Sequence, residues 1–133
     1  MQNSSYGAFW LAYSTVLIPG LGVEAAYEGD ERAYSFHMGI FLIGWCWLTF
    51  LFALAALRTN AAVMYTLITL VLAFLFLALG EFLHSQNPEQ AVRLTKTGGA
   101  FTVLTAMGAF YTGSHGLFLP ATTYFTIDVG KFK

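Results

Sequence analysis

The first residues that could perform chemistry are Glu81 and His84, spaced as Glu-x-x-His. On a helix this spacing places a carboxylate and an imidazole on one face, as in di-iron helix bundles. Such a site also needs carboxylates from neighbouring helices, and the other apolar stretches carry none at a matching depth. We therefore interpret the two residues as a pair at the membrane boundary, and we predict neither a metal site nor a cofactor.

No catalytic motif accompanies this pair. The chain has no G-x-S-x-G elbow, no phosphate-binding glycine loop and no Cys/His metal spacing. Its single cysteine, Cys46, lies within an apolar stretch and cannot form an internal disulfide. We predict that the protein is not an enzyme. The net charge of −1 also gives no electrostatic reason to expect a nucleic-acid partner.

Three further side chains could contact a polar solute at membrane depth. His115 is predicted about one turn inside the end of a helix, where it is either a proton-sensitive group or a hydrogen-bonded packing residue. Tyr6 and Tyr13 are seven residues apart and share a helix face. A tyrosine in such a place either anchors the membrane boundary or narrows a pore while offering its hydroxyl. The residue pattern leaves these alternatives open.

The spacing of charge indicates the elements that position these residues. Four long stretches contain no Asp, Glu, Lys or Arg: residues 6–23, 38–57, 61–80 and 97–120. Each is close to the roughly 20 apolar residues that a helix needs to cross a bilayer. Only 10% of the chain is charged and 57% is hydrophobic, whereas a soluble domain is about 25% charged. The sequence therefore predicts a protein whose solvent is the lipid bilayer.

The predicted fold is all-α: a polytopic bundle of four transmembrane helices in a single membrane domain, residues 1–133. We expect the helices at about 6–26, 38–57, 61–83 and 97–119, with a polar tail at 121–133. The short Arg58-Thr59-Asn60 turn predicts an antiparallel hairpin of the second and third helices. Pro88 is a plausible helix start, and Pro120 is expected to end the fourth helix.

Small residues recur at helical spacing on three of these predicted helices. They are Ala8, Ala12, Thr15 and Pro19 in the first, Thr66, Thr69, Ala73, Leu77 and Gly80 in the third, and Thr102, Thr105, Ala106, Ala109, Gly113 and Gly116 in the fourth. Small residues let helix backbones approach closely, and hydroxyl groups can bond across the contact. Such stripes indicate helix packing or the wall of a pore, and Thr66 and Thr69 are candidate hydroxyls along a substrate path.

Several segments together resemble the acetate uptake transporter family, which includes bacterial succinate–acetate permeases and fungal acetate/ammonia-associated membrane proteins. They are Ser5-Tyr6-Gly7-Ala8-Phe9-Trp10-Leu11, Ala25-Ala26-Tyr27, Leu42-Ile43-Gly44-Trp45, Leu57-Arg58-Thr59-Asn60, Leu79-Gly80-Glu81-Phe82 and Tyr124-Phe125-Thr126-Ile127-Asp128-Val129-Gly130. Members of that family have six membrane helices. This chain resembles the last four of these helices. The family's Asn-Pro-x-Pro-Leu-Gly-Leu signature, which leads into the first of its six helices, is absent from the sequence, and we expect a truncated member.

The resemblance implies transport of acetate or similar small monocarboxylates, channel-like or coupled to protons. It also implies a homo-oligomer, a hexamer in the family, in the plasma membrane. The family pore is narrowed by an apolar and aromatic constriction, and two of its positions correspond to Tyr6 and Leu70. Tyr13 and His115 complete the candidate path. The alternative function is a non-transporting four-helix membrane protein that assembles with full-length relatives or regulates them.

Overall fold

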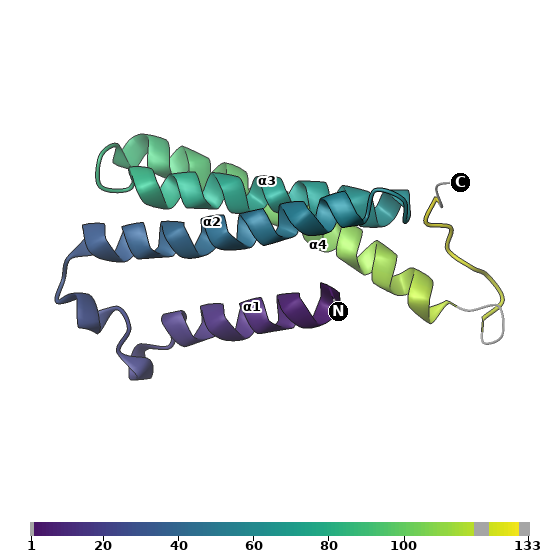
Figure 1. Cartoon of the computed structure of the whole chain (residues 1–133), viewed down its shortest axis with the longest axis horizontal. Coiled ribbons are helices and arrows are strands. Elements are labelled where there is room, and N and C mark those ends of the chain that lie inside the picture. The colour runs from purple at the N-terminus through teal and green to yellow at the C-terminus, as the bar shows by residue number, and fades with distance from the viewer. Residues whose placement is uncertain (1, 119–122, 131–133) are drawn as a thin grey trace.

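The computed structural model describes residues 2–118 and 123–130, and all its regular elements are helical. Four α-helices follow one another along the chain: α1 (Gln2–Leu17), α2 (Glu31–Ala55), α3 (Ala61–Leu83) and α4 (Pro88–Leu117). Two short 3₁₀ helices, η1 (Pro19–Leu21) and η2 (Ala25–Tyr27), join α1 to α2 (Figure 1). The all-α class predicted from the sequence is confirmed.

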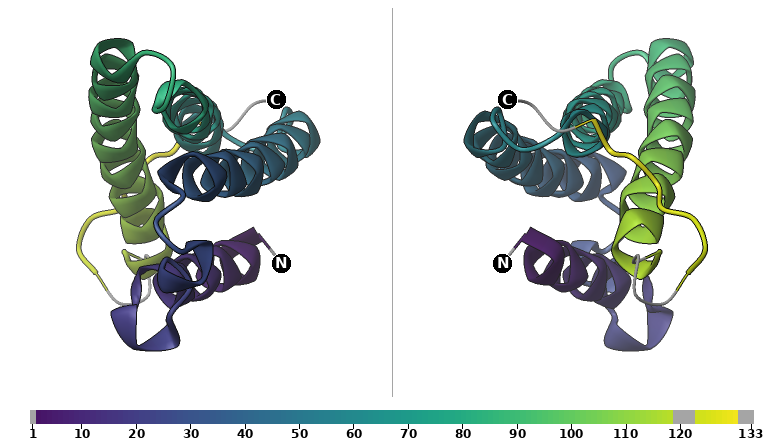
Figure 2. Two further views of the ribbon diagram at one scale, coloured as in Figure 1. Left: turned by 90° about the vertical axis from the view of Figure 1, so that its left-hand side faces the viewer. Right: turned by 90° about the vertical axis from the view of Figure 1, so that its right-hand side faces the viewer.

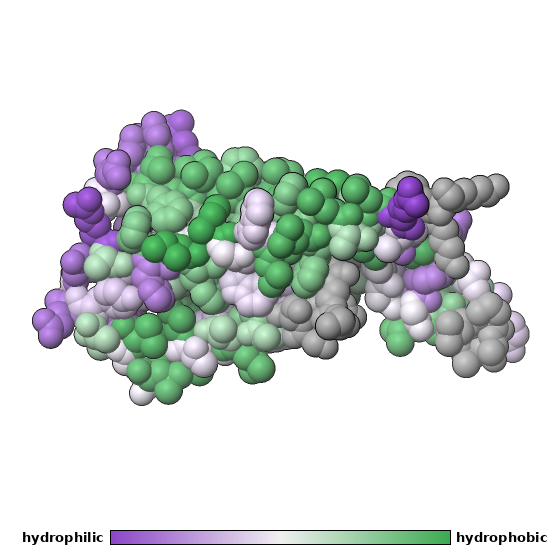
Figure 3. Space-filling view, viewed as in Figure 1, coloured by the Kyte–Doolittle hydropathy of each residue, from purple (hydrophilic) through white to green (hydrophobic). Residues whose placement is uncertain are grey.

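Two helices are long and apolar enough to cross a membrane. Within the described residues, α2 has a mean hydropathy of 2.1 and α3 of 2.5 over their most apolar windows. Much of their surface points outward and is apolar, as at Trp47, Leu54 and Ile68, which are all exposed. Figure 3 shows this apolar surface as a broad band between hydrophilic ends. A band of this kind suits lipid and not water, as expected for an all-α membrane bundle.

Polar residues fix where three of the helices begin. The side chains of Asp30 and Asn60 accept hydrogen bonds from the Ala33 and Val63 amides, 3.0 and 2.8 Å away, at the starts of α2 and α3. Asn87 does the same at α4, where Pro88 occupies the first turn. These caps satisfy backbone N–H groups that have no partner within the helix. The predicted helix start at Pro88 is thus observed, and the short turn before Asn60 joins α2 to α3 as a hairpin.

The helix bounds differ from the expected ones at both ends of the chain. The first helix was expected to run to residue 26, but α1 ends at Leu17 and Pro19 begins a separate 3₁₀ turn. Proline lacks an N–H and cannot continue the helical hydrogen bonds. At the other end, α4 begins at Pro88 and not at Thr97. The charge-free stretch marked only the apolar part of this longer helix. The expected end at residue 119 and Pro120 lie outside the described residues.

The second helix also begins earlier than expected, at Glu31 and not at residue 38. The first two turns of α2 carry charge, with Glu31 and Arg32 exposed to solvent. An amphipathic first segment can continue the helix into water, where its exposed side chains are hydrated. Absence of charge therefore located the apolar part of α2 and not its start.

The four helices are packed unequally. α3 packs against both α2 and α4. The ribbon of α1 stands apart from the other helices in the views of Figures 1 and 2, and side chains bridge that distance. The bundle therefore has a closely packed part, α2–α4, and a helix, α1, that side chains and the η1–η2 connection hold to it.

The described part of the tail folds back onto the start of α3. The carbonyl oxygens of Gly130 and Val129 accept hydrogen bonds from the amides of Ala61 and Ala62, at 2.9 and 3.3 Å. Val129 itself is buried. With the Asn60 cap on Val63, the tail supplies partners for the first amides of α3, which a helix cannot satisfy internally.

Candidate functional site

An aromatic cluster joins α1 to α2 and α3. Phe9 of α1 is buried at its centre, and five rings lie with centroids 5.1 to 5.8 Å from its own: Trp10, Tyr13, Phe41, Trp45 and Phe74. The rings meet edge-on or stacked, the two geometries that aromatic pairs favour. These side chains are long enough to fill the distance between α1 and the rest of the bundle. The cluster therefore determines where α1 lies.

Tyr6 lies one turn before Phe9 and packs on a neighbouring cluster of buried residues, Ala53, Ala56 and Leu67. The edge of its ring faces Phe52, with centroids 6.1 Å apart. Its hydroxyl donates a hydrogen bond to Oγ1 of Thr49, 3.3 Å away on α2. A tyrosine hydroxyl in apolar surroundings requires such a partner.

Leu70, the second expected constriction residue, is half-buried and packs against the buried cluster around Phe9. Tyr13 packs against the same cluster and stacks on Phe41. The structure thus brings Tyr6, Tyr13 and Leu70 to one apolar interface between α1, α2 and α3. The hydrogen-bonded hydroxyls of Tyr6 and Thr49 provide polar atoms within it.

The predicted hydroxyls Thr66 and Thr69 face another helix. Thr69 is buried and accepts a hydrogen bond from Oγ1 of Thr105 on α4, at 3.0 Å. The Thr66 hydroxyl bonds back to the carbonyl of Ala62 on its own helix. A Cβ added at Gly108 of α4 would lie 2.6 Å from Oγ1 of Thr66. Both threonines therefore belong to the α3–α4 interface, and their place in a substrate path stays a prediction.

His115 lies in the last turns of α4, apart from the aromatic cluster. Its Nδ1 hydrogen-bonds the carbonyl oxygen of Ile127, and the Tyr111 hydroxyl donates to the carbonyl of Asp128. Both side chains therefore hold the tail against α4. This contact is the hydrogen-bonded packing role that the sequence left open for His115, although a role in the path stays a prediction.

The packing stripes agree with the structure in α3 and only partly elsewhere. The backbones of α3 and α4 lie close together at Leu77 and Gly98. A Cβ added at Gly98 would lie 3.1 Å from the Leu77 backbone nitrogen. At Gly80 an added Cβ would lie 3.3 Å from the Ala91 carbonyl oxygen. By contrast, Gly113 and Gly116 of the expected α4 stripe have nothing within 4 Å of an added Cβ. The contact glycines of α4, Gly98 and Gly108, were not in the expected stripe.

Glu81 and His84 lie at the end of α3, as expected for a boundary pair. His84 is exposed and follows the last residue of the helix, whereas Glu81 is half-buried. The Glu81 side chain lies near Ser35 of α2. In the described part of the chain, no three His, Cys, Asp or Glu side chains gather as metal ligands would.

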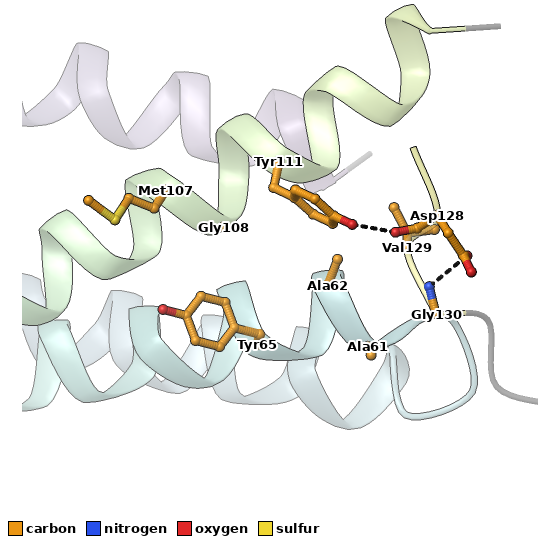
Figure 4. Close-up of a pocket in the computed structure, with 9 residues that line it drawn as sticks. All are labelled: Ala61, Ala62, Tyr65, Met107, Gly108, Tyr111, Asp128, Val129 and Gly130. Atoms are coloured by element: carbon orange, nitrogen blue, oxygen red, sulfur yellow. Dashed lines mark hydrogen bonds between the residues drawn. The ribbon is translucent and has the colours of Figure 1, made fainter. Parts of the chain in front are cut away.

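An open groove of about 490 Å³ lies between α3, α4 and the tail (Figure 4). It is lined by Ala61, Ala62, Tyr65, Met107, Gly108, Tyr111, Asp128, Val129 and Gly130. The Asp128 carboxylate, which lines the groove, accepts a hydrogen bond from the Gly130 amide at 3.0 Å. None of the expected path residues lines this groove.

Sequence reasoning missed Thr49, which has no exposed surface. Its contact with Tyr6 joins residues 43 positions apart, a separation that no local pattern reports. One signal was nevertheless available, because Thr49 carries the only hydroxyl among residues 38–57. Polar groups at membrane depth usually have a partner or a function.

The fold and this interface define an all-α membrane protein with an aromatic junction between its helices. Residues 1–133 match the family model described as the GPR1/FUN34/yaaH family. The chain belongs to this family, and the resemblance inferred from its motifs is confirmed.

Three relatives illustrate the similarity. Acetate permease A of Emericella nidulans is 33% identical over 97% of this chain and 45% of its own length. Meiotically up-regulated gene 86 protein of Schizosaccharomyces pombe is 33% identical over 96% of this chain and 41% of its own length. Ammonia transport outward protein 2 of Saccharomyces cerevisiae is 26% identical over 92% of this chain and 42% of its own length. The chain thus spans less than half the length of these relatives. No solved structure matches it.

Proposed function

We propose that this protein takes part in moving acetate or similar small monocarboxylates across a membrane. The observation that carries the proposal is the family match along the whole chain, together with relatives named acetate permease and acetate transporter. The proposed path follows the interface of α1, α2 and α3, with Tyr6 and Leu70 at its constriction and Tyr13 beside it.

The residues of this interface suit a weakly bound carboxylic acid. An apolar neck excludes hydrated ions because it cannot replace their water. The Tyr6 hydroxyl, held at 3.3 Å from Thr49, can replace part of the water around a small carboxyl group. The apolar stretches that carry Tyr6, Thr49 and Leu70, residues 6–23, 38–57 and 61–80, contain no Lys or Arg. A solute would therefore be released quickly, as conduction requires.

The finer parts of the proposal concern the coupling, assembly and membrane of the transporter. We propose channel-like or proton-coupled passage, a homo-oligomer of the hexameric type, and the plasma membrane as its place. These follow from the resemblance stated for the motifs around Tyr6, Arg58 and Glu81. We also propose that further helices or further copies complete the path, in keeping with relatives that are more than twice as long.

The test is uptake of labelled acetate into liposomes that contain the purified protein. We expect uptake above that of empty liposomes, and a changed rate or selectivity for Tyr6→Ala with assembly retained. Tyr124→Ala is the matched control, because Tyr124 is fully exposed in the tail, and it should behave as wild type. Equal uptake by wild type and empty liposomes would contradict the proposal. Methylammonium in place of acetate tests the second solute that the relatives' names suggest.

A second candidate function is assembly with another membrane protein, because exposed apolar side chains such as Trp47, Leu54 and Ile68 suit a helix partner as well as lipid. In this case the protein transports nothing alone and binds a longer relative. Co-reconstitution with such a relative separates the two functions. A change in the relative's acetate flux, without flux through this chain alone, would support the second function.

A further inference from the structure

We propose that Thr49 is a positioning residue, which fixes the Tyr6 ring across the substrate path and thereby determines the size of acid that passes. The inference rests on the proposed function for the transport step, and on the structure for the contact. Thr49 has no exposed surface, so it does not touch a solute itself. It acts through Tyr6, whose hydroxyl donates to its Oγ1.

The position of α1 makes this contact consequential. The backbone of α1 stands apart from α2 and α3 (Figures 1 and 2), so its side chains determine where Tyr6 lies. Two side chains of α2 make directional contacts with the Tyr6 ring: Phe52, with centroids 6.1 Å apart, and Thr49, through the hydrogen bond at 3.3 Å. The Phe52 contact permits the ring to slide, whereas a hydrogen bond fixes the hydroxyl end.

The neighbours of Thr49 make the hydroxyl hard to replace. Its helix presents Cys46 and Ala53 to the same side, one turn before and one turn after, and both are buried and apolar. Losing the threonine hydroxyl would leave the phenol with an apolar wall at this side. The ring would then be held less firmly at its hydroxyl end, because its hydrogen bond to α2 is lost. A ring that moves more freely changes the width of the constriction.

The test compares Thr49→Val with Thr49→Ser in the full chain in liposomes. Valine keeps the shape of threonine and removes the hydroxyl, whereas serine keeps the hydroxyl. The measured quantity is the ratio of acetate flux to butyrate flux. We expect this ratio to fall roughly two- to ten-fold in Thr49→Val, the equivalent of one hydrogen bond. Thr49→Ser should retain the wild-type ratio. An unchanged ratio in Thr49→Val would overturn the proposal.

Two controls separate positioning from general destabilisation. A purely structural role would lower the amount of folded protein and reduce both fluxes together, leaving their ratio unchanged. Thr112→Val makes the same chemical change at a half-buried site on α4, where the hydroxyl donates to the Gly108 carbonyl of its own helix and to no other helix of the described residues. It should leave the ratio at the wild-type value. In a Tyr6→Phe background the Thr49→Val change should have no further effect, because the bond is already absent.

A measurement without transport distinguishes failure of this inference from failure of the proposed function. The free energies of unfolding of Tyr6→Phe, Thr49→Val and the double variant form a double-mutant cycle in detergent micelles. A non-additive cycle supports the contact even if the wild type carries no acetate, in which case the transport proposal is the part that fails. An additive cycle overturns the positioning role, whatever the acetate flux.

Discussion

The α3–α4 interface and the junction of α1 hold helices together by opposite means. Between α3 and α4, glycines bring the backbones so close that an added Cβ at Gly98 would lie 3.1 Å from the Leu77 nitrogen. At α1, the rings of Phe9, Tyr13 and Trp45 fill a wider space. Backbone contacts of the first kind cannot adjust, whereas rings can rotate or slide. The contrast indicates that α2–α4 form a stiff frame and that α1 is the adjustable part.

The largest effect is expected for Phe9→Ala, which removes the centre of the aromatic cluster. Truncating a buried phenylalanine costs about 3–5 kcal/mol in well-packed cores. Here we expect α1 to separate while α2–α4 remain folded, as measured by cross-linking of cysteine pairs placed in α1 and α2. Leu11→Ala is the control, because Leu11 also lies on α1 and is 72% exposed. Equal loss of cross-linking in both variants would contradict the central role of Phe9.

Next in size is Gly98→Ala at the α3–α4 interface. The new Cβ meets the Leu77 backbone, which no change of rotamer can relieve. We expect a loss of about 1–3 kcal/mol in the free energy of unfolding, as for other overpacked sites. Gly99→Ala is the matched control, since nothing lies within 4 Å of its added Cβ. It should be neutral or stabilising, because alanine favours helix by about 1 kcal/mol over glycine. Equal losses in the two variants would refute the close contact.

A smaller loss is expected for Gly39→Ala on α2. Its added Cβ would lie 2.5 Å from the Phe82 ring, which is a side chain and can move. We expect a cost of about 1 kcal/mol, below that of Gly98→Ala. The second change Phe82→Leu should recover most of it, as measured by unfolding in micelles. Failure of this rescue would mean that the α2–α3 contact is as unyielding as the α3–α4 contact.

The smallest effect is expected for Thr105→Val, which removes the bond from Thr105 to Thr69. Hydrogen bonds between membrane helices average about 0.6 kcal/mol in mutant cycles. The double variant with Thr69→Val should therefore lose little more than either single one in thermal unfolding. A loss several times larger would mean that hydroxyl bonds, and not the glycine contacts, hold α3 to α4. Acetate flux of Thr69→Val tests the predicted place of that hydroxyl in the path.

Local sequence signals were sufficient for the hairpin but not for the whole of α4. Three residues at Arg58-Thr59-Asn60 leave no alternative to antiparallel neighbours. Pro88 favoured a helix start, but the absence of charge placed the fourth helix only from residue 97. The stripe on α3 was also readable, because Thr69, Ala73 and Gly80 share one face and are buried.

Other features depend on three-dimensional placement that spacing does not contain. The angle at which α4 crosses α3 selects Gly98 and Gly108 as contacts and leaves Gly113 open. Charge-free length predicted a longer first helix than the structure has, because Pro19 ends its hydrogen bonding. The partner of Tyr6 lies on another helix, so the candidate site was predicted by resemblance and its geometry came only from the fold.

The hydrogen bonds between the tail and α3 have a consequence for how the protein is made. The amides of Ala61 and Ala62 find their acceptors at Gly130 and Val129, which leave the ribosome after α4 has been synthesised. During synthesis the start of α3 is therefore exposed to the membrane surface with two amides that only water can satisfy. A nascent chain halted after α4 would have the α2–α3 hairpin without the hydrogen bonds from the tail. Synthesis of the tail is then the step that supplies acceptors for the Ala61 and Ala62 amides.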